Sequence, residues 1–260
     1  LILWKLYKDK VLLWYSETRT AHNTAQFAQN LGGLKPIAFF PNKDIFYGKY
    51  ESEFFHVIYD EKLIKKYRSS KKPELIRQCL NCYLYSKGIF KLGKPIVTNP
   101  NIKLNTQLMK YLDNNLVVRK ELKNNVYEIV KFYYRESQSY FQFFLNHENN
   151  SAESTIYEVE NFEELEVFLK KLNQFIKKQN IRYFQCFVSS YEPNHQKLFF
   201  DNNLIPYGYI PCWKYDKSLN RFYDSIIFIY YEGKINPNIK LIPETTELLN
   251  ALNFFTDLKK

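Results

Sequence analysis

Several features that define common protein classes are missing from this 260-residue sequence. No run of about 18 apolar residues occurs, which excludes a transmembrane helix of ordinary length. The opening ten residues lack the length and the cleavage site of a signal peptide. The first residue, Leu1, is not methionine, so we expect a piece of a longer, cytoplasmic protein. With 45% hydrophobic and 25% charged residues, the composition argues against a collagen-like, disordered or membrane-bundle protein and favours one large or two small globular domains.

Arginine is scarce, although the chain is basic, with a formal net charge of +10. Such a charge can indicate a nucleic acid or another anionic partner. Only seven of the 37 basic residues are arginine, however, and proteins that bind phosphates and bases favour the forked guanidinium group. Lysine, Asn, Ile, Tyr and Phe all have AT-rich codons, so the composition also fits an AT-rich genome. We therefore do not expect a nucleic-acid partner, and we expect no membrane partner.

Cysteine and histidine are also few, with four of each. Only Cys79 and Cys82 form a C-x-x-C pair, whereas a zinc site needs four ligands. We expect buried thiols in a reducing compartment and no metal. The scattered histidines predict no Ser-His-Asp arrangement. His195, close to Glu192, could form an acid–base pair, but an exposed helix histidine is the simpler interpretation.

The first 60 residues alternate between strand and helix patterns. We predict a strand at 10–17, a short helix at 21–31 that two glycines end, a strand at 34–40 stopped by Pro41, and a strand at 50–59. Residues 61–100 are rich in lysine and have helical spacing from Leu75 to Tyr83, so we predict a helical connector.

A second unit is predicted at residues 101–236, followed by a tail at 237–260. Its predicted strands are 116–122, 126–135, 139–147, 154–160, 182–189, 204–211 and 222–231. The clearest helix of the chain covers 162–179, where seven apolar residues form one stripe. Shorter helices are predicted at 193–202 and, weakly, at 247–255.

Two segments of the chain resemble each other. QFAQNLGGLKPIAFFP at 26–41 aligns without a gap with QKLFFDNNLIPYGYIP at 196–211. Each follows a buried strand, and each is followed by a loop and a strand with an acidic residue before serine (Glu51-Ser52 and Asp224-Ser225). We infer two copies of one fold unit; the alternative is a coincidence between two short strand-helix-strand pieces.

The second copy, NHQKLFFDNNLIPYGYIPCWKYDKSLNRFYDSIIFIYY, resembles the C-terminal part of acyltransferases of the GNAT superfamily. These proteins often end with a Q-K-L-F-x-x-x-G-F helix, an x-P-x-G strand start, a loop and a closing strand. The first copy, SETRTAHNTAQFAQNLGGLKPIAFFPNKDIFYGKYESEFFHVIY, is similar to the same part. The resemblance implies an α/β (α+β) fold with a GNAT-like mixed sheet flanked by helices, in two units. The second unit looks whole, and the first looks like the last third of one.

The resemblance also shows what the second unit lacks. GNAT enzymes hold the pyrophosphate of acyl-CoA with a Q/R-x-x-G-x-G/A turn at the start of the central helix. Here that junction, EVENFEE at 158–164, contains no glycine, and its four carboxylates would repel phosphate. Asn161 and Glu164 have the spacing of an N-cap and its capping-box partner. The tyrosine that acts as general acid in many family members is replaced by Gln29 in the first copy and by Phe199 in the second. We expect the second unit to be degenerate.

The leading hypothesis from the resemblance is an N-acyltransferase that uses acetyl-CoA or another acyl-CoA as co-substrate. The acceptor would be a small-molecule or peptide amine, and the chemistry would lie in the first unit. Glu17, at a strand end, is the candidate base or substrate contact, and Asn23, at a helix start, the candidate contact for the pantetheine arm. Both also have plain structural interpretations. We expect little activity from this chain alone. The alternatives are a non-catalytic binding module on the same fold and, third, a basic nucleic-acid-binding protein.

Overall fold

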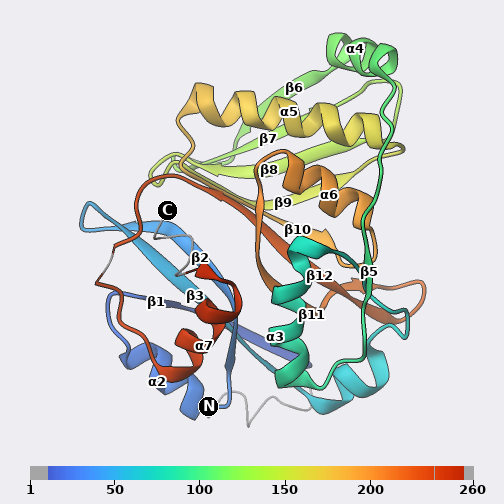
Figure 1. The fold of residues 1–260 in the computed structure, drawn as a ribbon. Coiled ribbons are helices and arrows are strands. Elements are labelled where there is room, and N and C mark those ends of the chain that lie inside the picture. The colour runs from blue at the N-terminus through green and yellow to red at the C-terminus, as the bar shows by residue number, and fades with distance from the viewer. Residues whose placement is uncertain (1–10, 237, 255–260) are drawn as a thin grey trace.

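The computed structural model describes residues 11–236 and 238–254, and Figure 1 shows their arrangement. One continuous sheet contains ten strands in the order β1-β3-β2-β11-β12-β10-β9-β8-β7-β6, and a separate small sheet pairs β4 with β5. The elements are, in chain order, β1 (Leu13–Arg19), α2 (Thr24–Leu31), β2 (Lys35–Phe46), β3 (Lys49–Tyr59), the π-helical turn η1 (Leu63–Tyr67), β4 (Glu74–Ile76), the 3₁₀ turn η2 (Arg77–Cys79), α3 (Leu80–Phe90), β5 (Ile96–Thr98), α4 (Thr106–Asn115), β6 (Val117–Leu122), β7 (Tyr127–Tyr133), β8 (Tyr140–Asn146), β9 (Ser151–Glu158), α5 (Phe162–Gln179), β10 (Tyr183–Ser189), α6 (Pro193–Asp201), β11 (Ile205–Asp216), β12 (Arg221–Tyr231) and α7 (Pro243–Ala251).

The second unit forms the upper and central part of Figure 1. Strands β6 to β9 pair antiparallel with their neighbours in sequence. The long helix α5 then leads to β10, which lies parallel to β9. The unit ends with α6 and the antiparallel pair β11–β12. This order of strands, long helix, strand, helix and two closing strands is the one that the GNAT resemblance implies. The predicted mixed α/β sheet flanked by helices is confirmed.

In the first unit, β1, β2 and β3 form an antiparallel group around β3. The prediction that Pro41 stops β2 is wrong, because the strand continues to Phe46. Proline lacks the N–H that a ladder requires, but strands tolerate it at bulges. Pro41 lies in the register shift between Phe40 and Asp44, where the regular pairing with β3 is interrupted.

Two predicted helices differ from the structure. Helical spacing from Leu75 suggested one helix through Tyr83, but Leu75 belongs to β4, and α3 begins at Leu80. The pairing of β4 with β5 and a hydrogen bond from Ile76 N–H to the Gln196 side chain hold this segment extended. The weak helix predicted at 247–255 is α7, which begins earlier, at Pro243, and packs on β2. The first difference comes from contacts with distant parts of the chain, whereas the start of α7 is marked locally by Pro243 and by the hydrogen bond from Ile242 N–H to Thr245 Oγ1.

The two copies of the repeat meet where β2 pairs antiparallel with β11, at Ala38 and Gly208. These two residues are equivalent in the gapless sequence alignment, which places position 208 opposite position 38. Both strands also carry register shifts at equivalent places: after Pro36 and Pro206, and after Phe40 and Ile210. The two copies are therefore related by an approximate two-fold axis through the Ala38–Gly208 contact.

Side-chain hydrogen bonds repeat across this axis. The amide Nε2 of Gln26 donates to the carbonyl oxygens of Arg19 and Lys240, at 3.2 and 2.8 Å. The equivalent Gln196 donates to the carbonyl oxygens of Ser189 and Glu74, at 3.1 and 2.9 Å. Both glutamines are fully buried. A buried amide must find partners, so these two identities of the repeat reflect one structural requirement.

The same bonds show that the units exchange their trailing segments. Glu74 follows the first unit in sequence but is bound by Gln196 of the second. Lys240 follows the second unit but is bound by Gln26 of the first. Glu74 N–H donates to Ser190, and Lys240 N–H donates to Thr20, the residue equivalent to Ser190. Each copy therefore forms hydrogen bonds with the segment that follows the other copy in sequence.

At a further pair of equivalent positions, the first copy has a neutral side chain, Ser52, and the second copy has a charged one, Asp224. Asn42 and Cys212 both have positive φ, at 50° and 54°. The N–H of Asn42 donates to Ser52 Oγ, and that of Cys212 donates to Asp224 Oδ1, both at 3.0 Å. Ser52 is thus the counterpart of Asp224, one position away from the Glu51–Asp224 match made from the sequence. The match between the two copies at this point therefore follows the acceptor of this hydrogen bond and not the position of the acidic residue.

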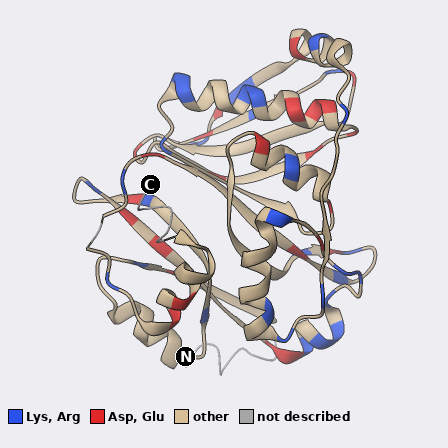
Figure 2. Ribbon diagram, viewed as in Figure 1, with Lys and Arg blue, Asp and Glu red and all other residues tan. Residues whose placement is uncertain are grey.

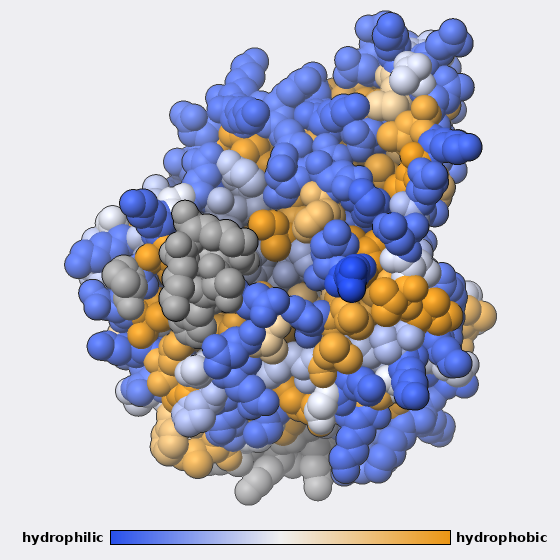
Figure 3. All heavy atoms as spheres, viewed as in Figure 1, coloured by the Kyte–Doolittle hydropathy of each residue, from blue (hydrophilic) through white to orange (hydrophobic). Residues whose placement is uncertain are grey.

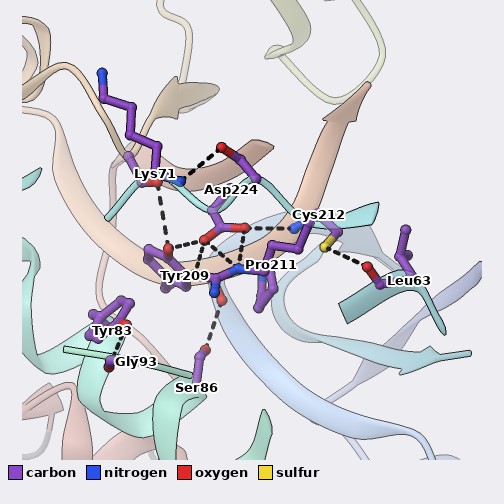
Figure 4. Close-up of polar contacts among 12 residues, drawn as sticks. Leu63, Lys71, Tyr83, Ser86, Gly93, Tyr209, Pro211, Cys212 and Asp224 are labelled. Carbon is purple, nitrogen blue, oxygen red and sulfur yellow. Dashed lines mark hydrogen bonds and ion pairs between the residues drawn. The ribbon is translucent and has the colours of Figure 1, made fainter. Parts of the chain in front are cut away.

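Asp224 collects the most polar contacts at this junction (Figure 4). Its carboxylate, fully buried, accepts from Arg68 through two nitrogens, with an ion pair of 2.5 Å, and also from the Tyr209 hydroxyl. Arg68 lies in the trailing segment of the first unit, so this ion pair fastens that segment to the second unit. Ser69 N–H adds a 2.8 Å bond to the Phe222 carbonyl.

Two groups of buried apolar side chains fill the molecule. One lies between α5, α6 and the β7–β10 part of the sheet, and the other lies around β2, β3 and α7. All four cysteines are buried and free, as expected from the sequence. Figure 3 shows a largely hydrophilic face with apolar side chains near β5, where Ile96 and Val97 are exposed. Within the described residues no helix is long and apolar enough to cross a membrane.

Gly208 provides a test of the close approach at the axis. A Cβ atom at Gly208 would lie 2.2 Å from Ala38 Cβ and 2.8 Å from Ala38 Cα. We expect Gly208→Ala to lower the free energy of unfolding by about 1–3 kcal/mol, the usual cost of overpacking. Chemical denaturation measures it. In the matched control, Gly88→Ala in α3, the new methyl meets no atom within 4 Å, and helix propensity predicts a gain of about 0.5–1 kcal/mol. Equal effects of the two changes would contradict the close contact.

The Arg68–Asp224 ion pair generates a second prediction. Arg68→Ala leaves a buried carboxylate without its guanidinium partner, which typically costs about 3–5 kcal/mol. The same denaturation experiment should show this loss. Lys65→Ala, which removes the exposed ion pair with Glu61, should leave the stability unchanged. A small effect at Arg68 would show that the trailing segment is held by other contacts.

Candidate functional site

The structure places Glu17 on β1, where its carboxylate forms an ion pair with the buried ammonium of Lys43. Lys43 also lies 3.8 Å from Glu53 and 3.7 Å from Glu153. Glu17 and Glu53 come from the first unit, whereas Glu153 lies on β9 of the second. The candidate base is therefore part of a cluster of one lysine and three carboxylates that spans both units.

Burial and mutual charge shift the protonation of this cluster. Burial raises the pKa of Glu53 to about 8, with further upward contributions from Asp44 and Glu17, against the opposing effect of Lys43. Burial also raises the pKa of Glu153. Lys43 loses solvation, yet the three carboxylates together raise its pKa, so it stays charged. The raised pKa of Glu53 favours its protonated form at neutral pH, beside the lysine cation.

Arg182 fixes the backbone around this cluster. Its guanidinium donates to the carbonyl oxygens of Asn42 and Lys43, the latter at 2.7 Å. Arg182 lies just before β10 and stacks over the Tyr50 ring, 5.0 Å from its centroid. The second unit thus supplies two groups near Glu17: the Glu153 carboxylate and the Arg182 guanidinium.

Asn23 is placed at the N-cap of α2, as predicted, and it is exposed. Its side chain makes no capping hydrogen bond. An N-cap asparagine normally bonds the free N–H groups of the first turn, so the Asn23 amide is not used for that purpose. Among the described residues, no hydrogen bond joins the side chains of Glu17 and Asn23.

In the second unit, the start of α5 caps itself, as the sequence predicts. Asn161 Oδ1 accepts from Glu164 N–H, and Glu164 Oε2 accepts from Asn161 N–H, at 2.9 and 3.3 Å. The Glu164 carboxylate also accepts from Glu160 N–H at 2.9 Å and from Ser139 Oγ at 2.6 Å. Figure 2 shows the acidic first turn and basic last turn of α5. A buried internal carboxylate thus occupies the position where a helix start could bind phosphate.

The two positions of the expected general acid differ in environment. Phe199 is fully buried in α6, with its ring 5.4 Å from that of Tyr157 and 5.8 Å from that of Phe228. Gln29 lies partly exposed in α2. Neither side chain is an acid, so the described residues offer no phenol at these positions.

The structure does bring His195 and Glu192 together. His195 Nδ1 lies 3.3 Å from Glu192 Oε2 and 3.2 Å from the Tyr157 hydroxyl. These groups lie where β9 and β10 stop pairing, since Cys186–Thr155 is their last matched pair. The hydrogen bond from His195 lowers the pKa of Glu192, and burial raises that of Tyr157 well above its usual value. The acid–base pair considered from the sequence is therefore formed, with a tyrosine added.

Sequence reasoning missed Lys43, Arg182 and Arg68, and it noted Asp224 only as a position of the repeat. Lys43 is 26 positions from Glu17, and Arg68 is 156 positions from Asp224. No local pattern marks these pairs. The repeat was a signal for Asp224, although the sequence matches it with Glu51 and the structure matches it with Ser52.

Comparisons with known proteins complete this description. No protein-family model matches the chain, and no curated protein sequence matches it. The structure is similar to spermidine/spermine N-acetyltransferase SpeG from Vibrio cholerae, with 9% identity, 46% of this chain and 94% of that chain covered, and a TM-score of 0.38. It is also similar to a probable acetyltransferase from Staphylococcus epidermidis, with 13% identity, 50% and 78% covered, and a TM-score of 0.32. The GNAT-like fold stated above rests on the order and pairing of the elements.

The protonated Glu53 predicts how stability depends on pH. Its pKa in the folded state, about 8, exceeds the ordinary value, so between these values the folded state keeps a proton that the unfolded state has released. The free energy of unfolding should therefore fall as pH rises from 5 to 8, by at most about 1.4 kcal/mol per unit for this group. Glu53→Gln, which stays neutral, should remove this contribution.

Denaturation at a series of pH values measures the difference between the two proteins. The control Glu148→Gln replaces an exposed glutamate and should keep the wild-type pH dependence. Parallel profiles for wild type and Glu53→Gln would show that Glu53 is ionised in the folded protein.

Proposed function

We propose that this chain belongs to an acyl-CoA N-acyltransferase in which the first unit carries the chemistry and the second is a catalytically silent companion. The observation that carries the proposal is the pseudo-symmetry of the two units. In the second unit, β9 lies parallel along the outer edge of β10. The equivalent outer edge of β1 has no partner strand among the described residues. The co-substrate site of the first unit would be completed at that edge by a further strand and helix start.

The candidate residues differ between the two copies in the way the proposal requires. Counting along the same alignment, Glu17 corresponds to Phe187 and Asn23 to Pro193. The second unit thus lacks both polar groups, and Glu164 fills its helix start. At these two positions, polar groups suited to a base and to an amide contact are present only in the first unit.

In the proposed reaction the acceptor amine attacks the thioester carbonyl carbon. The C–N bond forms, the C–S bond breaks, and the CoA thiolate leaves and takes up a proton. Glu17 would accept the proton that the amine loses, directly or through a water, while Lys43 holds its carboxylate in place. A backbone N–H would stabilise the oxyanion. The acceptor is a small-molecule or peptide amine.

One observation favours a non-catalytic binding module instead. Glu17 is already engaged by the protein, because its carboxylate forms an ion pair with the buried Lys43 ammonium. In such a module the whole Lys43 cluster would serve only to join the two units.

Calorimetry with acetyl-CoA separates these functions. We expect acetyl-CoA to bind to a version of the protein that is extended upstream by roughly 100 residues. We expect no binding to this chain alone. Binding by neither protein would favour the module. Tight binding by this chain alone would overturn the assignment to the first unit.

Substitution in the extended protein tests the base. We expect Glu17→Gln to lower kcat by about 10²- to 10⁴-fold, the usual contribution of general acid–base catalysis. The matched control, Glu158→Gln, changes an exposed strand glutamate of the second unit and should leave kcat and KM unchanged. Equal activity of the Glu17 variant and wild type would remove Glu17 from the mechanism.

A further inference from the structure

A cavity of about 570 Å³ lies in the second unit, away from the residues assigned above to catalysis. It is bounded by the end of β10, the turn before α6, the β11–β12 hairpin and the loop before β4. Its size falls within the range of small-molecule sites, about 300–1,000 Å³.

Three lysines from separate segments line this cavity: Lys71, Lys214 and Lys217. In residues 11–236 and 238–254, none of their ammonium groups has an ion-pair partner. The three lysines outnumber the two carboxylates of the lining, Glu192 and Asp216, so the cavity keeps an excess of positive charge. An anion bound between the lysines would offset that excess.

The two carboxylates that line the same cavity are already engaged by the protein. Asp216 Oδ1 accepts from Ser218 N–H, Ser218 Oγ and Leu219 N–H, at 2.8, 2.6 and 3.2 Å, which shapes the hairpin turn. Glu192 is held by His195. The His195 hydrogen bond lowers the pKa of Glu192, and the charges of Lys214 and Lys71 lower it further. The Ser218 hydrogen bond lowers the pKa of Asp216, and the charge of Lys214 also lowers it. No lysine of the lining, however, forms a direct ion pair in the described part of the chain.

Aromatic side chains form the remaining walls. Tyr191 and Tyr223 pack edge to face, with ring centroids 5.4 Å apart, and Tyr215 packs on Phe222 at 4.7 Å. Tyr215 is 44% exposed and offers a flat surface to a planar group, whereas Tyr191 is 6% exposed and has the Lys71 ammonium 5.7 Å from its ring centroid. The cavity therefore combines an anion-binding side with an aromatic side.

The first unit shows that the cavity is not a general feature of the fold. At the equivalent place Arg19 stands for Ser189 and Glu51 for Tyr223, and these two form a bidentate ion pair at 2.6 Å. The Arg19 guanidinium also stacks over Phe46, the counterpart of Asp216, 3.6 Å from the ring centroid. In addition, Lys214 is replaced by Asp44. The space that is filled in the first copy is open and basic in the second.

We propose that this cavity binds a small phosphate monoester with a flat ring, of the nucleoside monophosphate class. The phosphate would lie between Lys71, Lys214 and Lys217, and the ring against the tyrosines. This site is independent of the acyltransferase proposal, since it uses neither the outer edge of β1 nor Glu17.

Calorimetry with AMP on the chain as it stands tests this site. We expect the double variant Lys214→Gln/Lys217→Gln to bind AMP at least about tenfold more weakly, a loss of about 1.4 kcal/mol. The control Lys177→Gln/Lys178→Gln removes the same charge from the last turn of α5 and should bind like wild type. Both lysines of the test pair are exposed, and equal melting temperatures would show that folding is unchanged.

Two ligand fragments separate the two halves of the proposal. Inorganic phosphate and adenosine should each bind more weakly than AMP if phosphate and ring both contribute. Inorganic phosphate that binds as tightly as AMP would overturn the role of the tyrosines. No binding of millimolar AMP by wild type, or an equal loss in the test and control variants, would overturn the site.

Discussion

The contact between Ala38 and Gly208 is the constraint on which the rest of this structure depends. It lets two backbones approach so closely that a methyl group on Gly208 would overlap its neighbour. Through it, β2 and β11 join two small sheets into one. Because the contact lies on the approximate two-fold axis, the segment that leaves each copy can reach the buried glutamine of the other. The interface between the units therefore contains close backbone packing and buried hydrogen bonds, as the interior of a single domain does.

Equivalent positions in the two copies show how one backbone supports different chemistry. The positive φ at Asn42 and Cys212 needs an acceptor for its N–H, and either Ser52 or Asp224 supplies it. A serine is neutral and needs no counter-ion, whereas a buried aspartate requires one, and Arg68 provides it. The charged version therefore ties the connecting segment into the second unit, and the first copy has no such demand.

The sequence was sufficient where the signal is local. The apolar stripe of α5 gave its bounds, and the Asn161–Glu164 spacing gave its capping box, because both depend on residues within a few positions. Local patterns failed where distant contacts decide, as in β4, held extended by Gln196. They also failed at Lys43, whose carboxylate partners come from three strands of two units. Glu17 and Asn23 were found only through the resemblance, which gives positions but not partners.

The geometry at the start of α5 supports our proposal that the second unit binds no co-substrate phosphate. The missing glycines are only part of the reason. Glu164 is buried and accepts from two backbone N–H groups and from Ser139. A phosphate would have to displace this carboxylate and leave it buried without partners, which costs more than the helix dipole returns. The donors that could hold a ligand stabilise the fold instead. Restoring glycine alone would not recreate the site, because the internal anion would still occupy it.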